Sequence, residues 1–234
     1  MKMWKLVPLY TIVIVGALAL AFWGSEAVNV MVNNSPIPGR TCIVIDPGHG
    51  GIDGGASSCT GVLESQINLK IGLRLNDLLN FLGYKTIMVR TTDTSIYTEG
   101  NTIAAQKVSD LKQRVKLVNE QEDCILISIH QNTFSDSKYA GAQVFYAKDD
   151  TSKTLASSLQ AKLIETLNPQ SNRKSKPSDG IYLMQNITKP GLLIECGFLT
   201  NPQEEALLRN ATYQQKLCCV IATTLSEYFT SQGP

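Results

Sequence analysis

Four side chains that can bind a metal ion or carry a proton lie where the pattern of the sequence changes. His49 and His130 are the only two histidines, and each lies at or just after the end of a short apolar run. Glu64 opens a stretch with helical spacing, and Glu195 interrupts the apolar run that begins at residue 191. Imidazole nitrogens and carboxylate oxygens are ligands of catalytic zinc, and a further carboxylate can move protons beside it.

These residues predict a zinc centre with one open position. His49, His130 and Glu64 would supply three ligands, and a water with a pKa lowered toward about 7 would take the fourth place. Glu195 would then take up and deliver protons without binding the metal, because a carboxylate in a buried strand is costly unless a partner or a cation lies near it.

Other interpretations of the same residues stay open at this point. Either histidine could be a hydrogen-bonded structural residue at the end of a strand. Glu64 could be a favourable negative charge at the N-terminus of a helix, and Glu195 could belong to a structural ion pair. The glycine-rich loop 48–51 lacks the spacing of the nucleotide-binding glycine motifs, which disfavours a phosphate site there.

The elements that must position these residues alternate between strands and helices. Apolar or β-branched runs predict strands at residues 41–45, 84–89, 124–129, 142–146, 181–184 and 192–196. Helical spacing predicts helices at residues 64–82, 109–121 (capped by Ser109 or Asp110), 149–167, from Pro202 onward, and 211–229. This order predicts an α/β domain whose central sheet has helices on both faces, with functional residues at the C-terminal ends of the strands.

Composition and charge exclude several classes of protein. The chain has 234 residues, of which 43% are hydrophobic and 18% charged, so it is neither disordered nor collagen-like. It carries 21 Lys and Arg against 20 Asp and Glu, and the first 27 residues hold two of the cations and one of the acids. The remainder is therefore neutral, and it lacks the basic footprint of a nucleic-acid-binding protein.

The N-terminus predicts a targeting or anchoring segment. Lys2 and Lys5 precede 18 uncharged, largely apolar residues at 6–23, a length between that of a signal peptide and that of a spanning helix. We therefore expect a signal peptide or a membrane anchor over residues 1–27, a linker over 28–40 and a catalytic domain over 41–231. The lysines favour the cytoplasmic side, which places the domain outside the cytoplasm and limits membrane contact to this segment.

Six segments, in the right order, resemble the motifs of the zinc-dependent N-acetylmuramoyl-L-alanine amidases, the cell-wall hydrolases often called amidase type 3. They are residues 45–56 (IDPGHGGIDGGA), Glu64, residues 89–93 (VRTTD), Arg114 with Asn119, residues 128–132 (SIHQN) and residues 195–201 (ECGFLTN). The resemblance covers about residues 41–229, with Val118 where the family usually has alanine. Gln131, the short single domain and the N-terminal segment are most similar to the germination-specific members that act on the spore cortex.

The resemblance implies one zinc ion bound by His49, Glu64 and His130, with Glu195 as the catalytic carboxylate. It also implies hydrolysis of the peptidoglycan amide bond between the lactyl group of N-acetylmuramic acid and L-alanine. The family fold is a single α/β domain with a mixed, mostly parallel sheet. We further expect Asn132 and Arg114 to form hydrogen bonds to the substrate or to the residues around the metal.

The resemblance leaves partners and competing activities to be tested. Many members of the family carry a wall-binding domain that we do not expect here, so activity is expected to depend on an accessory activating protein or on membrane tethering. The expected location is the cell envelope or the spore intermembrane space. The alternatives are another zinc peptidase of the cell wall, cutting as a carboxypeptidase or endopeptidase, and a non-catalytic envelope scaffold.

Overall fold

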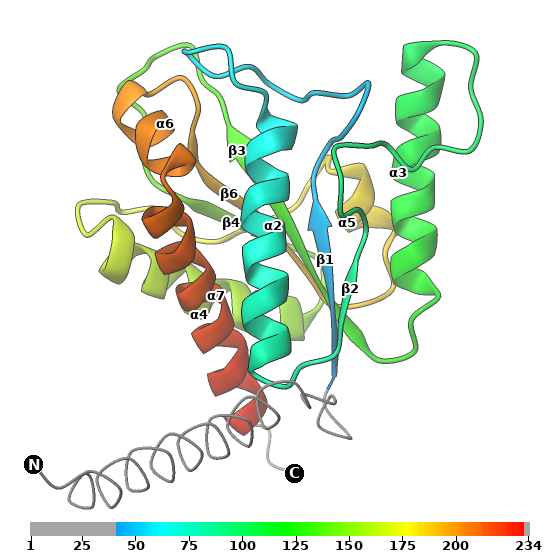
Figure 1. Cartoon of the computed structure of the whole chain (residues 1–234). Helices are drawn as coiled ribbons and strands as arrows, with labels where there is room; N and C mark the ends of the chain where they lie inside the picture. Colours follow the sequence, from blue (N-terminus) through cyan, green and yellow to red (C-terminus); the bar gives the residue numbers. More distant parts are fainter. Residues whose placement is uncertain (1–40, 232–234) are drawn as a thin grey trace, which may run out of the picture. The chain divides into compact units, whose positions relative to one another are not determined.

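A mixed sheet of six strands forms the centre of the computed structural model, which describes residues 41–231 (Figure 1). The predicted N-terminal segment and linker lie outside the described residues. The strands are β1 (Cys42–Pro47), β2 (Thr86–Met88), β3 (Cys124–Asn132), β4 (Gln143–Tyr146), β5 (Lys176–Pro177) and β6 (Gly191–Phe198). Their order is β2-β1-β3-β6-β4-β5, and every neighbouring pair is parallel except β4 with β6. The predicted mixed, mostly parallel sheet is confirmed.

Helices cover both faces of this sheet. They are α2 (Glu64–Phe81), α3 (Ile103–Asn119), α4 (Asp150–Leu167), α5 (Tyr182–Asn186), α6 (Pro202–Arg209) and α7 (Ala211–Ser231). Figure 1 shows α2 and α7 in front of the sheet and α3 and α5 on its other side. No helix within residues 41–231 is long and apolar enough to cross a membrane.

Each face of the sheet has its own apolar cluster, because both faces are buried. Ile45, Ile127 and Ile194 belong to the cluster that includes residues of α2, α4 and α7. Val44 and Leu193 belong to the second cluster, with residues of α3 and α5. Burial on both faces explains why these strands are apolar throughout rather than alternating, as is typical of parallel sheets.

The register of the parallel strands brings their carboxyl ends together. Asp46 at the end of β1 is the Cα partner of Ser128 in β3, and His130 in β3 is the partner of Glu195 in β6. Two residues that are far apart in the sequence thus become neighbours on adjacent strands. The loop that carries His49 leaves the same edge of the sheet.

The structure corrects two of the predicted elements. The predicted strand 181–184 is helical in α5, because a four-residue apolar run does not by itself distinguish a strand from a buried helical turn. Helix α3 begins at Ile103 rather than at residue 109, because the Thr102 hydroxyl accepts the N–H of Ala105 at 3.2 Å and caps the helix earlier. Ser109 lies within the helix, where its hydroxyl accepts a backbone N–H from the loop that precedes it.

Removing the cap of α3 tests where this helix begins. We expect Thr102→Ala to lower the free energy of unfolding by about 1 kcal/mol, because the N–H of Ala105 loses its partner. Thr102→Ser keeps the hydroxyl and should retain most of the stability. Urea denaturation measures both variants, and an alanine variant as stable as the wild type would contradict the cap.

Candidate metal centre

A tight turn directly after β1 holds His49 in a conformation that is rare outside glycine. The φ of His49 is 61°, and Gly50 and Gly51 follow with φ of 137° and 57°. Backbone hydrogen bonds of 2.7 and 3.1 Å between Gly50 and Asp53 close the turn. It brings the Asp53 carboxylate within 2.8 Å of His49 Nδ1, while His49 Nε2 lies 3.3 Å from Oε2 of Glu64.

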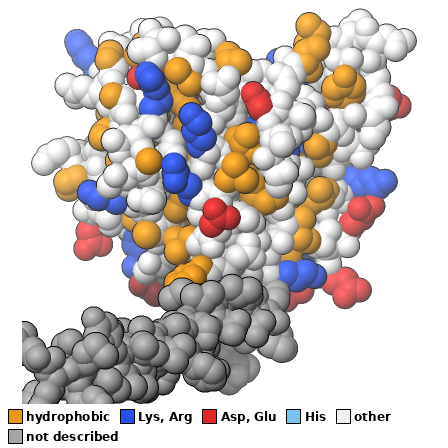
Figure 2. All heavy atoms as spheres, in the orientation of Figure 1, with side chains coloured by type: hydrophobic (Ala, Val, Ile, Leu, Met, Phe, Trp, Pro, Cys, Tyr) orange, Lys and Arg blue, Asp and Glu red, His pale blue; other side chains and the backbone are white. Residues whose placement is uncertain are grey.

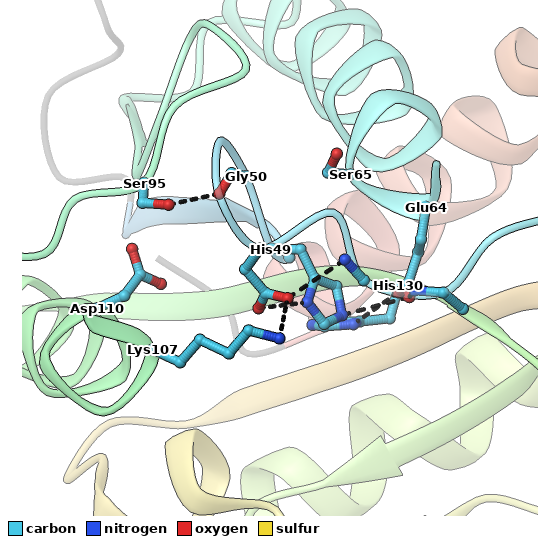
Figure 3. Close-up of polar contacts among 12 residues, drawn as sticks. His49, Gly50, Glu64, Ser65, Ser95, Lys107, Asp110 and His130 are labelled. Carbon is cyan, nitrogen blue, oxygen red and sulfur yellow. Dashed lines mark hydrogen bonds and ion pairs between the residues drawn. The ribbon is translucent and has the colours of Figure 1, made fainter. Parts of the chain in front are cut away.

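A chain of charged contacts leads from helix α3 to the His49 ring (Figure 3). The ammonium group of Lys107 lies 2.8 Å from one oxygen of Asp53, and His49 contacts the other. Burial lowers the pKa of His49, but its hydrogen bonds with Asp53 and Glu64 and their charges raise it to about 9. The hydrogen bond to His49 outweighs burial and, with Lys107, holds the pKa of Asp53 well below its usual range. Asp53 is therefore an ionised bridge between Lys107 and the His49 ring.

Arg114 of α3 binds the backbone of the same turn from beneath. Its guanidinium donates to the carbonyl oxygens of Pro47 and His49 at 3.1 and 2.7 Å. It also forms ion pairs with the buried carboxylates of Asp46 and Asp110. Arg114 is only 2% exposed, so its place in the structure is that of a positioning residue under the loop.

Arg90, which follows β2, binds the turn from a second direction. It donates to the carbonyl oxygens of Pro47, Gly48 and Ser65 at 2.8, 3.0 and 2.8 Å. The amide of Asn68 in α2 donates to the Gly48 carbonyl at 3.1 Å. Buried carbonyl groups need hydrogen-bond donors, and beyond β1 a neighbouring strand no longer supplies them. The side chains of Arg90 and Asn68 donate to these carbonyl groups instead.

Glu64 is fixed at the start of α2 by donors from three directions. One oxygen accepts the backbone N–H of Ala56 at 3.0 Å, and the other accepts the backbone N–H of Gln131 at 3.0 Å and the amide of Asn68 at 3.3 Å. The side chain is buried with only 4% exposure. The carboxylate is thereby held in one orientation before any ligand arrives.

His130 of β3 completes the cluster against a glycine. His130 Nδ1 lies 3.0 Å from Oε1 of Glu64, and the rings of His49 and His130 are 5.0 Å apart between centroids. Burial raises the pKa of Glu64, but the hydrogen bonds and charges of the two histidines outweigh it and hold that pKa well below its usual range. A Cβ atom on Gly48 would come within 2.2 Å of the His130 ring, so this ring position requires glycine there.

The structure therefore brings together a His–Glu–His cluster that could hold a metal ion. One donor atom from each of His49, Glu64 and His130 lies within 4.8 Å of the others. Two imidazole nitrogens and one carboxylate oxygen are a donor set of catalytic zinc sites, which keep a fourth position open for water or substrate. The chemistry of these donors and their prior orientation both fit that ion.

Glu195 lies in the next strand beside this cluster. Its Cα partner in β3 is His130, and its Oε2 is a buried oxygen without a hydrogen-bond partner among the described residues. Burial raises the pKa of Glu195, and the positive charge of the histidines only partly opposes that effect. An unpaired carboxyl group with a raised pKa is suited to exchanging protons with a nearby ligand.

A cavity of about 350 Å³ opens next to the cluster, on the side of α3 and α5. His49 and His130 form part of its wall, and Leu111, Tyr182 and Leu193 supply apolar surface. This cavity gives a substrate access to the histidines. Asn132 lies at the end of β3, where its carbonyl oxygen accepts the N–H of Leu199 at 2.8 Å.

Several residues that position the cluster were missed by our sequence analysis. Asp53 was available as the residue four positions after His49, a spacing that fits a carboxylate supporting a histidine. Arg90 belongs to the motif at residues 89–93, which marked the residue without indicating its contacts. Lys107 and Asn68 come from distant segments, and their residue types alone carry no signal for these contacts. Only the packing of α2 and α3 against the turn brings them there.

Comparisons with known proteins agree along nearly the whole described part of the chain. A family model described as N-acetylmuramoyl-L-alanine amidase matches residues 43–227. The chain is 43% identical over 200 residues to the germination-specific N-acetylmuramoyl-L-alanine amidase of Bacillus subtilis (strain 168). That match covers 85% of this chain and 83% of the relative.

Solved structures give the same result. The CwlD amidase from Clostridioides difficile, described in complex with the GerS lipoprotein, matches with a TM-score of 0.78 and 39% identity, over 82% of this chain and 100% of that one. An N-acetylmuramoyl-L-alanine amidase from Clostridium difficile 630 matches with a TM-score of 0.71 and 30% identity, over 86% of this chain and 100% of that one.

Removing the buried guanidinium of Arg114 should destabilise the fold in a pH-dependent way. Burial raises the pKa of Asp46, but the charge and hydrogen bond of Arg114, together with His130 and the hydroxyl of Ser128, outweigh it and the net pKa is lowered. This carboxylate therefore stabilises the wild type above its ordinary pKa of about 4, and that contribution is lost as the pH falls through the lowered value. In Arg114→Met the pKa of Asp46 should rise above its ordinary value, so the folded variant gains stability on protonation.

We expect Arg114→Met to lower the free energy of unfolding by about 3–5 kcal/mol at pH 7 and by less at pH 5. Chemical denaturation at both pH values measures the difference from the wild type. The control is Lys148→Met, which breaks an ion pair with Asp179 in which both side chains are exposed (72% and 68%) and should cost about 1 kcal/mol or less. A loss for Arg114→Met that stays constant between the two pH values would contradict the assignment to Asp46.

Proposed function

The chain belongs to the N-acetylmuramoyl-L-alanine amidase family, and we propose that it uses one zinc ion to hydrolyse the amide bond between N-acetylmuramic acid and L-alanine in peptidoglycan. The observation that carries the proposal is the meeting of His49, Glu64 and His130 beside the unpartnered carboxyl group of Glu195. We assign the first three residues as the zinc ligands.

The proposed zinc ligands and the residues that orient them have separate roles at the site. When bound, zinc supplies a Lewis acid that polarises the scissile carbonyl group and lowers the pKa of water at the open position. Asp53 holds the His49 ring through Nδ1, and the N–H groups of Ala56 and Gln131 orient Glu64. Such outer contacts fix the direction of ligand atoms and commonly alter metal affinity.

Glu195 is the proposed proton carrier of the reaction. Its carboxylate would accept a proton from the attacking water and deliver it to the nitrogen of the leaving L-alanine. Burial supports this role because it raises the pKa of the group, which makes the carboxylate a better proton acceptor. Asn132 is proposed to form a hydrogen bond to the substrate, and Arg114 to act by positioning the His49 loop.

The biological setting follows from the relatives. The Bacillus subtilis relative is named germination-specific, and the Clostridioides difficile CwlD amidase is described in complex with a lipoprotein. We infer that this chain acts on spore-cortex peptidoglycan, outside the cytoplasm, and that an accessory protein supports its activity. Residues 1–27 would export or anchor the catalytic domain 41–231, with residues 28–40 as the linker.

Replacing the proposed proton carrier tests the mechanism and the bond that is cut. We expect Glu195→Gln to retain zinc and to lower the turnover number by about 10²–10⁴-fold, because the amide cannot carry a proton. Mass spectrometry of peptidoglycan fragments follows release of the intact stem peptide, and elemental analysis gives the zinc content. Glu165→Gln, on the exposed surface of α4, is the control and should behave as the wild type.

Two results of that experiment would contradict the proposal. Unchanged turnover in Glu195→Gln would remove this residue from the mechanism. A shortened stem peptide, in place of the intact one, would identify another zinc peptidase of the cell wall.

Weakening the support of His49 tests the assignment of the ligands. We expect Asp53→Asn to lower zinc affinity by about 10–100-fold, because the ring loses its charged partner. Competition with a chromophoric chelator measures the affinity directly. Asp179→Asn changes an exposed carboxylate paired with Lys148 and should leave zinc affinity unchanged. Equal affinities of Asp53→Asn and wild type would argue against His49 as a ligand.

A further inference from the structure

A groove of about 680 Å³ with a basic lining lies beside the start of β4. We call it the basic groove and define it by Lys138, Arg173, Lys174, Lys176 and Gln143. The described residues that line it include these four cations and no carboxylate. It is formed by the loop after β3 and the loop after α4, which turns back at the left of Figure 1.

One of the four cations is held in place, whereas the lysines are exposed. Arg173 Nε donates to the carbonyl oxygen of Ala140 at 3.0 Å, and Nη1 donates to Oε1 of Gln143 at 3.5 Å. Its guanidinium also stacks over the ring of Phe198, with 4.9 Å to the centroid. A guanidinium that is already oriented loses little conformational freedom when it binds an anion.

The basic groove is a short distance from the proposed metal centre along one row of the sheet. Gln143 of β4 is the Cα partner of Glu195 in β6, which is in turn the partner of His130 in β3. Neighbouring strands are about 4.8 Å apart, so Gln143 lies about 10 Å from His130 across the sheet. A peptide extends by at most about 3.6 Å per residue, so this distance corresponds to two or three residues beyond the scissile bond.

The cavity on the other side of the metal centre has a different character. Leu111, Tyr182 and Leu193 give it apolar surface. Its three carboxylates, Asp46, Asp53 and Asp110, are already paired with the cations Arg114 and Lys107 that line it too. The basic groove instead has four cations and no carboxylate in its described lining, so an anionic group of a substrate is better matched beside β4.

We propose that the basic groove binds the carboxylates of the stem peptide that follows the scissile amide. Carboxylates pair well with arginine and lysine, and a stem peptide presents its free C-terminus and its acidic side chains. This inference rests on the proposed function. It adds that the enzyme selects substrates by the carboxylates of the stem peptide. The lysines and Arg173 would act on substrate affinity rather than on the chemical step.

The test compares two muropeptides that differ only in charge, one with free carboxylates and one with those groups amidated. The full-length wild type should show a kcat/KM about tenfold higher for the free acid, mainly through KM, as expected for two or three exposed ion pairs. The triple variant K138Q/K174Q/K176Q should lose this preference. The variant K85Q/K112Q/K153Q removes the same charge from exposed lysines outside the basic groove and should keep it.

Titration calorimetry with the free-acid stem peptide tests the same site without turnover. The peptide should bind the wild type about tenfold more tightly than the basic-groove variant. Equal binding by both, or equal use of the two muropeptides by the wild type, would overturn the inference. Binding of inorganic polyphosphate with indifference to the carboxylates of the peptide would overturn it as well and identify a surface for another anionic polymer.

The two proposals fail in different ways. Cleavage of both muropeptides without preference leaves the amidase standing and removes the basic groove from substrate selection. Absence of any amide cleavage with zinc bound and the accessory protein supplied, together with peptide binding that depends on the three lysines, would overturn the proposed function and retain the peptide site.

Discussion

The candidate site depends on two buried guanidinium groups that bind the backbone carbonyls of the loop after β1. Arg90 and Arg114 reach this loop from different elements and both donate to the carbonyl oxygen of Pro47. Burying a guanidinium is costly unless its charge and its donors find partners. Asp46 and Asp110 supply the charge for Arg114, and the loop supplies acceptors for both arginines. The guanidinium donors of the arginines and the carbonyl groups of the loop thus satisfy each other, and each set depends on the other for hydrogen-bond partners.

This mutual dependence explains how His49 can remain in an unfavourable backbone conformation. A left-handed φ at a residue with a side chain persists only where the surroundings determine it. Here Arg114 holds the carbonyl of His49 itself, and Asp53 holds its ring. The direction of the imidazole is therefore set by the fold before any metal binds, and so is that of Glu64 at the start of α2.

The sequence predicts the parts of this arrangement that depend on local pattern. Apolar runs that end in polar residues correctly placed His130 at a strand end, and the helical spacing after Glu64 correctly placed that residue at a helix start. The pattern failed where it was short or ambiguous, as in α5, and where a side chain decided a boundary, as with Thr102. The contacts of Lys107 and Arg90 could not be predicted, because they depend on how α3 and the segment after β2 pack against the loop.

The polar residues at the carboxyl ends of the strands also fix the register, which the apolar strands alone do not specify. A strand that is apolar on both faces does not specify its register by hydrophobic pattern, since a shift by one residue still buries apolar side chains. Asp46 accepts the hydroxyl of Ser128 at 2.7 Å, which fixes β1 against β3. Glu64 accepts the backbone N–H of Gln131, which fixes α2 against the same end of β3.

These polar contacts therefore favour the observed alignment, in which Asp46 and Glu64 both have hydrogen-bond partners. In that alignment His130 meets Glu195 across β3 and β6. Among the described residues, Oε2 of Glu195 is the only carboxylate oxygen among the four buried side-chain oxygens without a hydrogen-bond partner, and it belongs to the strand beside the proposed zinc ligands. Some of the residues that specify the fold at this edge are thus the ones that we propose to carry the chemistry. The others are their direct neighbours.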